Sequence, residues 1–192
     1  NEAIKVITGI RRSGKTFLMN MFIDFLHQEG IEDDQIIHIN FEDLAFNAIK
    51  DEMDLYHYVH DHENKKKKNY LFFDEIQHVK NWEKAINSFR VDMNADIYVT
   101  GSNAHLLSGE LATLLSGRYV ELTVYPLSFK EYYDYNHGNP ENRYQLFTQY
   151  IVDGGFPAVD IAPNEDLKTA LKKGIFDSVV LRDIAMRAKT RD

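Results

Sequence analysis

Cysteine is absent from the 192 residues, so no disulfide framework can form, and the composition fits a cytoplasmic protein. Long apolar runs are absent too: no segment approaches the roughly 20 apolar residues that span a bilayer, and no secretory signal is visible. We therefore expect no membrane partner. Basic charge is scarce. The net charge of −8 argues against broad, non-specific binding of nucleic acid but leaves a local basic groove open.

Several catalytic signatures are also missing. The sequence has no His-Glu-x-x-His, Gly-x-Ser-x-Gly or Asn-Lys-x-Asp motif. His57, His60, Asp61 and His62 have the composition of metal ligands, but their spacing matches no zinc signature. Polar residues at a helix end are the favoured interpretation of this cluster. Because the chain begins with Asn1 rather than Met and ends in a basic, helical pattern, we expect a fragment of a longer protein.

Apolar residues make up 44% of the chain, which suits a globular core. Their spacing alternates between strand and helix periods up to residue 126. Strands are expected at 4–8, 36–39, 70–73, 97–99 and 119–124. Such alternation predicts an α/β fold: a three-layer sandwich with a parallel five-stranded sheet and helices on both faces. Only helical patterns follow Leu127, so we expect a core at 1–126 and a small helical lid at 127–192.

The first expected strand leads into a glycine-bounded loop. Gly9, four residues, Gly14, Lys15 and Thr16 have the spacing of a phosphate-binding loop, whose N–H groups cradle phosphate oxygens. A helix beginning near Lys15 would favour an anion at its start. Lys15 would reach the terminal phosphates, and the Thr16 hydroxyl would hold Mg²⁺. An ordinary glycine-rich turn is the alternative, but the strand before and the helix after favour the phosphate loop.

The loop defines one set of candidate nucleotide contacts. The arginines in its variable part are equally compatible with contacts to phosphate, solvent or a partner. The full set comprises Gly9, Ile10, Arg11, Arg12, Ser13, Gly14, Lys15, Thr16 and Phe17.

Two carboxylates close the apolar run at 70–73. A carboxylate at the end of a buried strand is costly unless something positive uses it. Asp74 is expected to lie beside Mg²⁺, and Glu75 to polarise the water that attacks the γ-phosphate. A pair of acidic turn residues is the alternative, which the phosphate-loop pattern makes the weaker one.

Four further residues are weaker candidates. Asn40 ends the second strand and is placed to hydrogen-bond Glu75, although an Asn at a strand end equally suits a turn. Ser102 and Asn103 follow the fourth strand, where either one could sense the γ-phosphate or cap a helix. Spacing alone favours a surface ion pair for Arg118, and an arginine finger that reaches the nucleotide of a neighbouring subunit is the alternative.

Taken together, the chain resembles the AAA-type P-loop ATPases. It is most similar to a bacterial and archaeal AAA-domain family that is often joined to a C-terminal domain of unknown function. The resemblance rests on Ile-Thr-Gly-Ile-Arg-Arg-Ser-Gly-Lys-Thr (7–16), Phe-Phe-Asp-Glu-Ile-Gln (72–77), Thr-Gly-Ser-Asn (100–103), Ser-Gly-Arg-Tyr (116–119), Tyr-Pro-Leu-Ser-Phe (125–129) and Gly-Gly-Phe-Pro (154–157).

The resemblance implies a role for each motif. Residues 9–16 would be the Walker A loop, and residues 74–75 the Walker B pair. Asn40 would be a glutamate switch, and Arg118 an arginine finger acting in trans within a homo-oligomer. Ser102 or Asn103 would be sensor one. The residues that would line the base of the nucleotide are Gly155, Phe156 and Pro157.

We therefore expect an ATPase that binds ATP or ADP with Mg²⁺ and couples hydrolysis to conformational change in other domains or partners. Lys15 and Glu75 carry this expectation. A signalling switch that hydrolyses ATP slowly, a P-loop small-molecule kinase and an adaptor with an inactive site remain alternatives.

Overall fold

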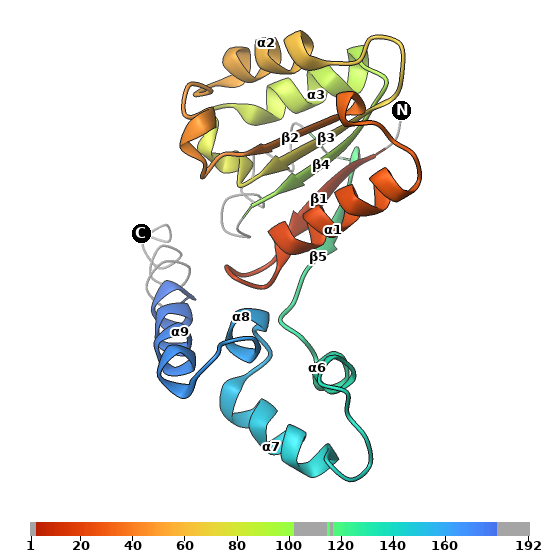
Figure 1. Ribbon diagram of the computed structural model, residues 1–192. Coiled ribbons are helices and arrows are strands. Elements are labelled where there is room, and N and C mark those ends of the chain that lie inside the picture. Colours follow the sequence, from red (N-terminus) through yellow and green to blue (C-terminus); the bar gives the residue numbers. More distant parts are fainter. Residues whose placement is uncertain (1–2, 102–114, 116, 180–192) are drawn as a thin grey trace. The chain divides into compact units, whose positions relative to one another are not determined.

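The computed structural model describes residues 3–101, 115 and 117–179 (Figure 1). The chain forms two compact units. The first contains Asn1–Thr8 and Lys15–Thr123, and the second contains Gly9–Gly14 and Val124–Asp192. The glycine-bounded loop thus groups with the second unit, although β1 and α1 on either side of it belong to the first.

A five-stranded parallel sheet forms the centre of the first unit, in the order β2-β3-β4-β1-β5 (Figure 1). Its strands are β1 (Ile4–Thr8), β2 (Ile36–Asn40), β3 (Asn69–Asp74), β4 (Ala95–Thr100) and β5 (Tyr119–Thr123). The predicted number of strands and their parallel direction are confirmed.

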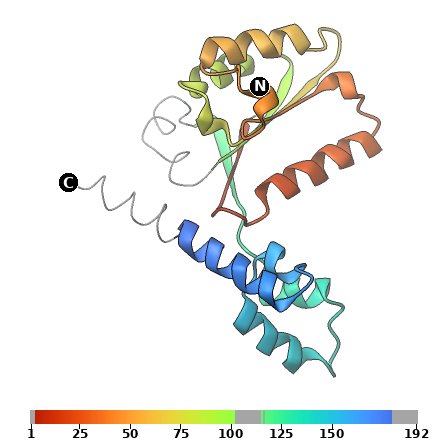
Figure 2. The ribbon, with the colours of Figure 1, turned by 60° about the vertical axis from the view of Figure 1, so that its left-hand side comes forward.

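Helices cover both faces of this sheet (Figures 1 and 2). On one face, the Phe22 ring of α1 packs edge-on against Phe72 of β3 at 6.1 Å. On the other face, Phe89 of α3 stacks with Phe73 at 6.2 Å. Neighbouring residues of a strand point to opposite faces, so this pair of contacts defines three layers. The helices are α1 (Lys15–Gln28), α2 (Glu52–His62) and α3 (Trp82–Asp92).

Burial on both faces explains why the sequence of β3 is a continuous apolar run. Leu71, Phe72 and Phe73 are fully buried, as parallel strands are when helices cover both faces. Local signals set the helix ends: Asp51 caps α2 by accepting hydrogen bonds from the N–H groups of Met53 and Asp54.

The described part of the second unit, apart from the loop, is helical. Its helices are α6 (Phe129–Tyr135), α7 (Arg143–Asp153), α8 (Pro157–Asp160) and α9 (Glu165–Asp177). Ser128 and Glu131 form a capping box at the start of α6, and Asn164 caps α9 by accepting from the N–H of Leu167. No helix within the described residues is both long enough and apolar enough to cross a membrane.

Gly155 has a clear structural role within this second unit. Its carbonyl accepts a hydrogen bond of 2.7 Å from the N–H of Leu127. A Cβ added at Gly155 would lie 2.1 Å from the Leu127 carbonyl oxygen, so any larger residue would force the backbone apart. Close approach therefore explains one glycine of the Gly-Gly-Phe-Pro segment without any ligand.

Candidate functional site

Polar residues end three neighbouring strands at one edge of the sheet. Asn40 is the last residue of β2 and pairs in register with Asp74, the last residue of β3. Thr100 ends β4, which pairs with the other side of β3. β2 and β3 are therefore neighbouring parallel strands. In open α/β sheets this carboxyl edge is where ligands bind.

Asp74 is the buried centre of this edge, with 1% of its surface exposed. The Thr16 hydroxyl donates to its Oδ2 at 2.7 Å, although the two residues are 58 positions apart in sequence. The Thr100 hydroxyl donates to its Oδ1. Two hydroxyl donors thus offset the cost of burying a carboxylate.

The donor set around Asp74 fits a divalent cation. Mg²⁺ prefers oxygen ligands and is usually held by one or two carboxylates together with phosphate oxygens and water. Thr16 contributes a hydroxyl oxygen and Asp74 a carboxylate, and they already lie within hydrogen-bond distance of each other. Thr16 and Asp74 could therefore hold the cation together.

Glu75 adopts a backbone conformation that is unusual for a residue with a β-carbon. Its φ is 54° and its ψ is 46°, in the left-handed region, which costs about 1–2 kcal/mol. The Thr100 hydroxyl accepts a hydrogen bond of 3.0 Å from the Glu75 N–H, and the Gln77 amide donates to the Glu75 carboxylate. A strained acidic residue held at both backbone and side chain is typical of a functional site.

The glycine-bounded loop has the features that the phosphate-loop interpretation requires. Gly9 and Gly14 have φ angles of +149° and +105°, which side chains resist. A Cβ at Gly9 would also lie 2.3 Å from the carbonyl oxygen of Val124. Ser13 has a buried hydroxyl with no hydrogen-bond partner among the described residues. An unsatisfied buried hydroxyl in a loop of this shape suits an anionic ligand.

Lys15 follows the loop as the first residue of α1, and only 5% of its surface is exposed. A lysine buried at a helix start is unusual, because burial disfavours its charge unless an anion or a polar group compensates. The role of Lys15 as a phosphate ligand stays a prediction.

The weaker candidates have other contacts in the structure. The Asn40 amide oxygen accepts a hydrogen bond from the N–H of Glu42 at 3.0 Å, as the strand-end alternative expects. The Arg118 guanidinium donates to the side-chain oxygen of Asn87 at 3.2 Å. Ser102 and Asn103 lie outside the described residues. The roles of these residues in catalysis stay predictions.

Sequence reasoning missed Thr100 and Gln77. Each carried a signal: Thr100 ends an apolar strand that neighbours the Asp74 strand, and Gln77 comes two residues after Glu75. A hydroxyl at the end of a strand is common, however, so its partners become visible only once the strand order is known.

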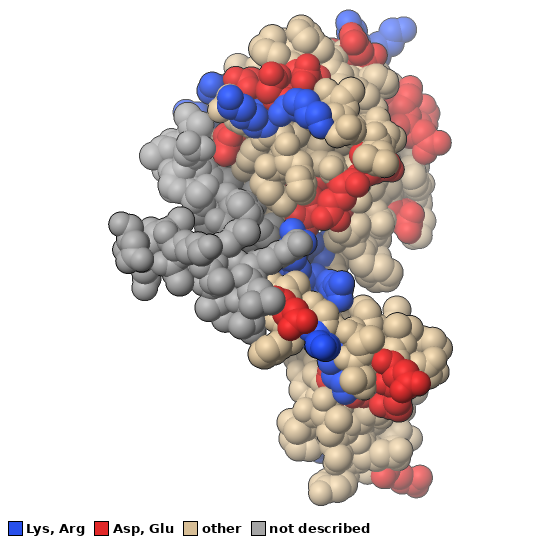
Figure 3. Space-filling view, turned by 90° about the vertical axis from the view of Figure 1, so that its left-hand side faces the viewer, with Lys and Arg blue, Asp and Glu red and all other residues tan. Residues whose placement is uncertain are grey.

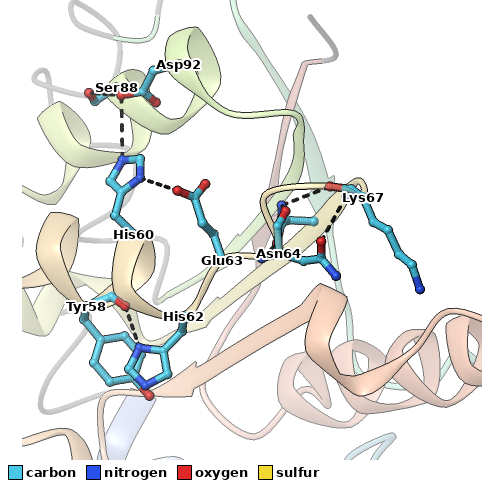
Figure 4. Close-up of polar contacts among 9 residues, drawn as sticks. Tyr58, His60, His62, Glu63, Asn64, Lys67, Ser88 and Asp92 are labelled. Carbon is cyan, nitrogen blue, oxygen red and sulfur yellow. Dashed lines mark hydrogen bonds and ion pairs between the residues drawn. The ribbon is translucent and has the colours of Figure 1, made fainter.

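The histidines of α2 make contacts typical of a helix end (Figure 4). His60 Nδ1 lies 3.0 Å from a Glu63 carboxylate oxygen, and His62 Nδ1 lies 2.7 Å from the backbone carbonyl oxygen of Tyr58. One nitrogen of each ring thus has a partner close by in sequence, whereas the buried Nε2 of His60 has no hydrogen-bond partner among the described residues and lies 3.8 Å from an Asp92 carboxylate oxygen. This arrangement supports the interpretation of these residues as polar groups at a helix end.

Charge is mixed on the surface. On the face shown in Figure 3, the described lysine and arginine side chains form small groups next to aspartate and glutamate. Among the described residues on this face, these groups do not join into a continuous basic band of the kind that binds a nucleic-acid backbone.

Comparison with known proteins gives both a family and relatives. A family described as AAA domain matches residues 1–133. An uncharacterised protein from Haemophilus influenzae is 47% identical over 194 residues, covering 100% of this chain and 48% of that protein. An uncharacterised protein from Methanocaldococcus jannaschii is 36% identical over 200 residues, covering 98% and 43% respectively. The chain spans less than half the length of these relatives.

One similar solved structure is the crystal structure of Saccharomyces cerevisiae RIF2. It aligns with a TM-score of 0.45 and 13% identity over 85% of this chain and 72% of that chain. A likeness at this level carries no weight for fold or function.

Proposed function

The chain belongs to the AAA domain family, and on that premise we propose that it binds ATP with Mg²⁺ and hydrolyses ATP to ADP and phosphate. Membership of this family makes it a nucleotide-binding, AAA-type domain. The hydrolysis and its coupling to other parts of the protein are the proposal.

The observation that carries the proposal is the hydrogen bond of 2.7 Å between Thr16 and Asp74. Thr16 ends the glycine-bounded loop motif, and Asp74 ends β3, which lies between β2 and β4. These two residues come from the two motifs that predicted a site for a metal-bound triphosphate. Their meeting at the carboxyl edge of the sheet supports a single site built from both motifs.

Each part of this site has a physical task. The N–H groups of the 9–14 loop and the Lys15 ammonium bind phosphate oxygens. Thr16 and Asp74 are the residues that would hold Mg²⁺, which supplies charge neutralisation of the phosphates when bound. The hydroxyl oxygen of Thr16 and the carboxylate of Asp74 are oxygen ligands of the kind that Mg²⁺ prefers.

Glu75 is the proposed general base. Its carboxylate orients the attacking water and accepts a proton from it as the new bond to the γ-phosphorus forms and the bond to the leaving ADP oxygen breaks. Phosphoryl transfer of this kind depends mainly on positioning and charge stabilisation. The contacts of Glu75 with Thr100 and Gln77 hold it for that task.

We retain the remaining assignments as parts of the same proposal. Residues 1–126 form the core and residues 127–192 the helical lid, and the protein is cytoplasmic. Asn40 acts as the glutamate switch, Ser102 or Asn103 as sensor one, and Arg118 as an arginine finger in a homo-oligomer. Gly155, Phe156 and Pro157 line the base of the nucleotide. Hydrolysis drives conformational change in domains or partners beyond this chain.

Two substitutions test the proposal directly. Lys15→Ala removes the phosphate ligand and is expected to abolish ATP binding in calorimetry, whereas Lys66→Ala in an exposed loop leaves binding unchanged. Glu75→Gln keeps binding but lowers the single-turnover hydrolysis rate about a hundredfold or more. Exposed Glu141 provides the matched control, Glu141→Gln. A Glu75→Gln variant that hydrolyses ATP at the wild-type rate would contradict the assigned base.

A further inference from the structure

Gln77 lies beside the proposed general base. It belongs to the short 3₁₀ turn Ile76–His78, which begins directly after Glu75. Its side-chain amide nitrogen donates a hydrogen bond to the Oε2 atom of Glu75. In contrast, the hydrogen bond of the predicted switch residue Asn40 runs to the N–H of Glu42. The amide that contacts Glu75 is therefore that of Gln77.

The surroundings of Glu75 explain why its carboxylate needs to be held. Glu42, Glu75 and His78 each place one ligand atom within 4.8 Å of the others. The Glu42 carboxylate repels that of Glu75 at this distance, because like charges close together raise each other's energy. Glu42 and His78 are exposed, so water competes for the same carboxylate. A donor fixed on the adjacent turn opposes both effects.

The side-chain oxygen of Gln77 indicates that this residue does more than stabilise the fold. Its oxygen is buried and has no hydrogen-bond partner among the described residues. An unsatisfied buried acceptor is costly, and an apolar side chain of the same size would avoid that cost. What an apolar side chain cannot supply is the hydrogen bond to Glu75.

We propose that Gln77 is a positioning residue for hydrolysis, which donates to the Glu75 carboxylate and holds it in the conformation that accepts a proton from the attacking water. This inference rests on the proposed function of Glu75. It assigns Gln77 no contact with substrate, so its effect on the reaction passes through Glu75 alone.

Gln77→Met in the full-length protein tests the role, because methionine keeps the length of the side chain and removes the donor. The expected result is a kcat about tenfold to a hundredfold lower, since hydrogen bonds to charged groups are strong. KM for ATP and the affinity for a non-hydrolysable ATP analogue stay within about twofold, because Gln77 contributes nothing to binding. Gln28→Met, at the exposed end of α1, is the matched control and keeps the wild-type rate.

The Glu75→Gln background separates positioning from other roles. In single-turnover experiments, adding Gln77→Met to Glu75→Gln is expected to change the residual rate less than twofold. An equal loss in both backgrounds would overturn the inference, because Gln77 would then act through another group. Gln77→Glu keeps the size but replaces the donor with a carboxylate that repels Glu75, so it is expected to lower kcat at least as far; it covers the case in which Gln77→Met fails to fold.

Failure of this inference is distinguishable from failure of the proposed function. A wild-type protein that binds no ATP overturns both. An active wild type, an inactive Glu75→Gln variant and a Gln77→Met variant with the wild-type kcat overturn the role of Gln77 alone. The Gln77 side-chain amide resonances in NMR add a readout without hydrolysis: we expect them to shift in Glu75→Ala, and an unchanged spectrum contradicts the contact.

Discussion

At the scale of single residues, Thr100 connects the two acidic groups of the site. Its hydroxyl donates to Asp74 and accepts from the Glu75 N–H, so one oxygen fixes a buried carboxylate and a strained backbone together. Thr100 is fully buried, and therefore no water replaces its hydroxyl if it is removed.

Thr100→Val removes this hydroxyl at nearly constant volume. We expect a loss of about 2 kcal/mol in the free energy of unfolding, because Asp74 and the Glu75 N–H each lose a partner. The rate of ATP hydrolysis should fall as well. Thr100→Ser keeps the hydroxyl and is the matched control. Urea unfolding followed by the fluorescence of Trp82 measures the stability, and equal stability of the valine and serine variants would contradict the connecting role.

The residues of the site differ in how far the sequence predicts them. Spacing reveals Lys15, Thr16 and Asp74, because a phosphate loop and an acidic strand end are local patterns. Thr100 and Gln77 act through contacts with Asp74 and Glu75, and these depend on strand order and on the turn after β3. No spacing in the sequence specifies such contacts.

At the scale of elements, helix ends follow the sequence closely. Ser128 and Asn164 cap their helices with side chains that accept from the first N–H groups, an interaction that depends only on residues close by in sequence. The ion pair between α7 and α9 was not predictable, since its partners come from different helices. Asp153 lies 3.1 Å from the ammonium of Lys168 and 2.8 Å from that of Lys172.

This ion pair predicts a dependence of stability on pH. Burial alone would raise the pKa of Asp153, but hydrogen bonds from Lys172 and Lys168 outweigh it and hold that pKa below its ordinary value of 3.8. The charged Asp153 therefore stabilises the fold at every pH above the pKa that it has in the unfolded chain. This stabilisation is lost as the pH falls through its lower pKa in the folded protein. The protection factors of the α7 and α9 amides, which compare each exchange rate with the intrinsic rate at the same pH, should therefore fall below about pH 4.

Asp153→Asn tests the same pair at neutral pH. Both Asp153 and Lys168 are 7% exposed, so the substitution leaves a buried ammonium without its main partner and costs about 3 kcal/mol. Asp134→Asn is the control, because Asp134 pairs with an exposed lysine, Lys130, and the expected cost is below about 0.5 kcal/mol. If α7 and α9 exchanged at the same rates in the two variants, the contacts of Asp153 would not stabilise these helices more than an exposed ion pair does.

At the scale of the whole molecule, the parallel direction of the sheet follows from the alternation of strands and helices. The order β2-β3-β4-β1-β5 does not, because several orders satisfy the same alternation. That order places β3 between β2 and β4, so that Asn40, Asp74 and Thr100 end at one edge. The fold thereby assembles the site from segments far apart in sequence.

The most direct test of the account is the affinity for ATP, measured by calorimetry with and without Mg²⁺, in the wild type and in Asp74→Asn. Thr16 and Asp74 are proposed to hold the cation that accompanies ATP. We expect Mg²⁺ to tighten ATP binding by the wild type, and Asp74→Asn to lose about tenfold or more of that gain while retaining the binding seen without Mg²⁺. A wild type that binds no ATP, or an Asp74→Asn variant with the full gain from Mg²⁺, would contradict it.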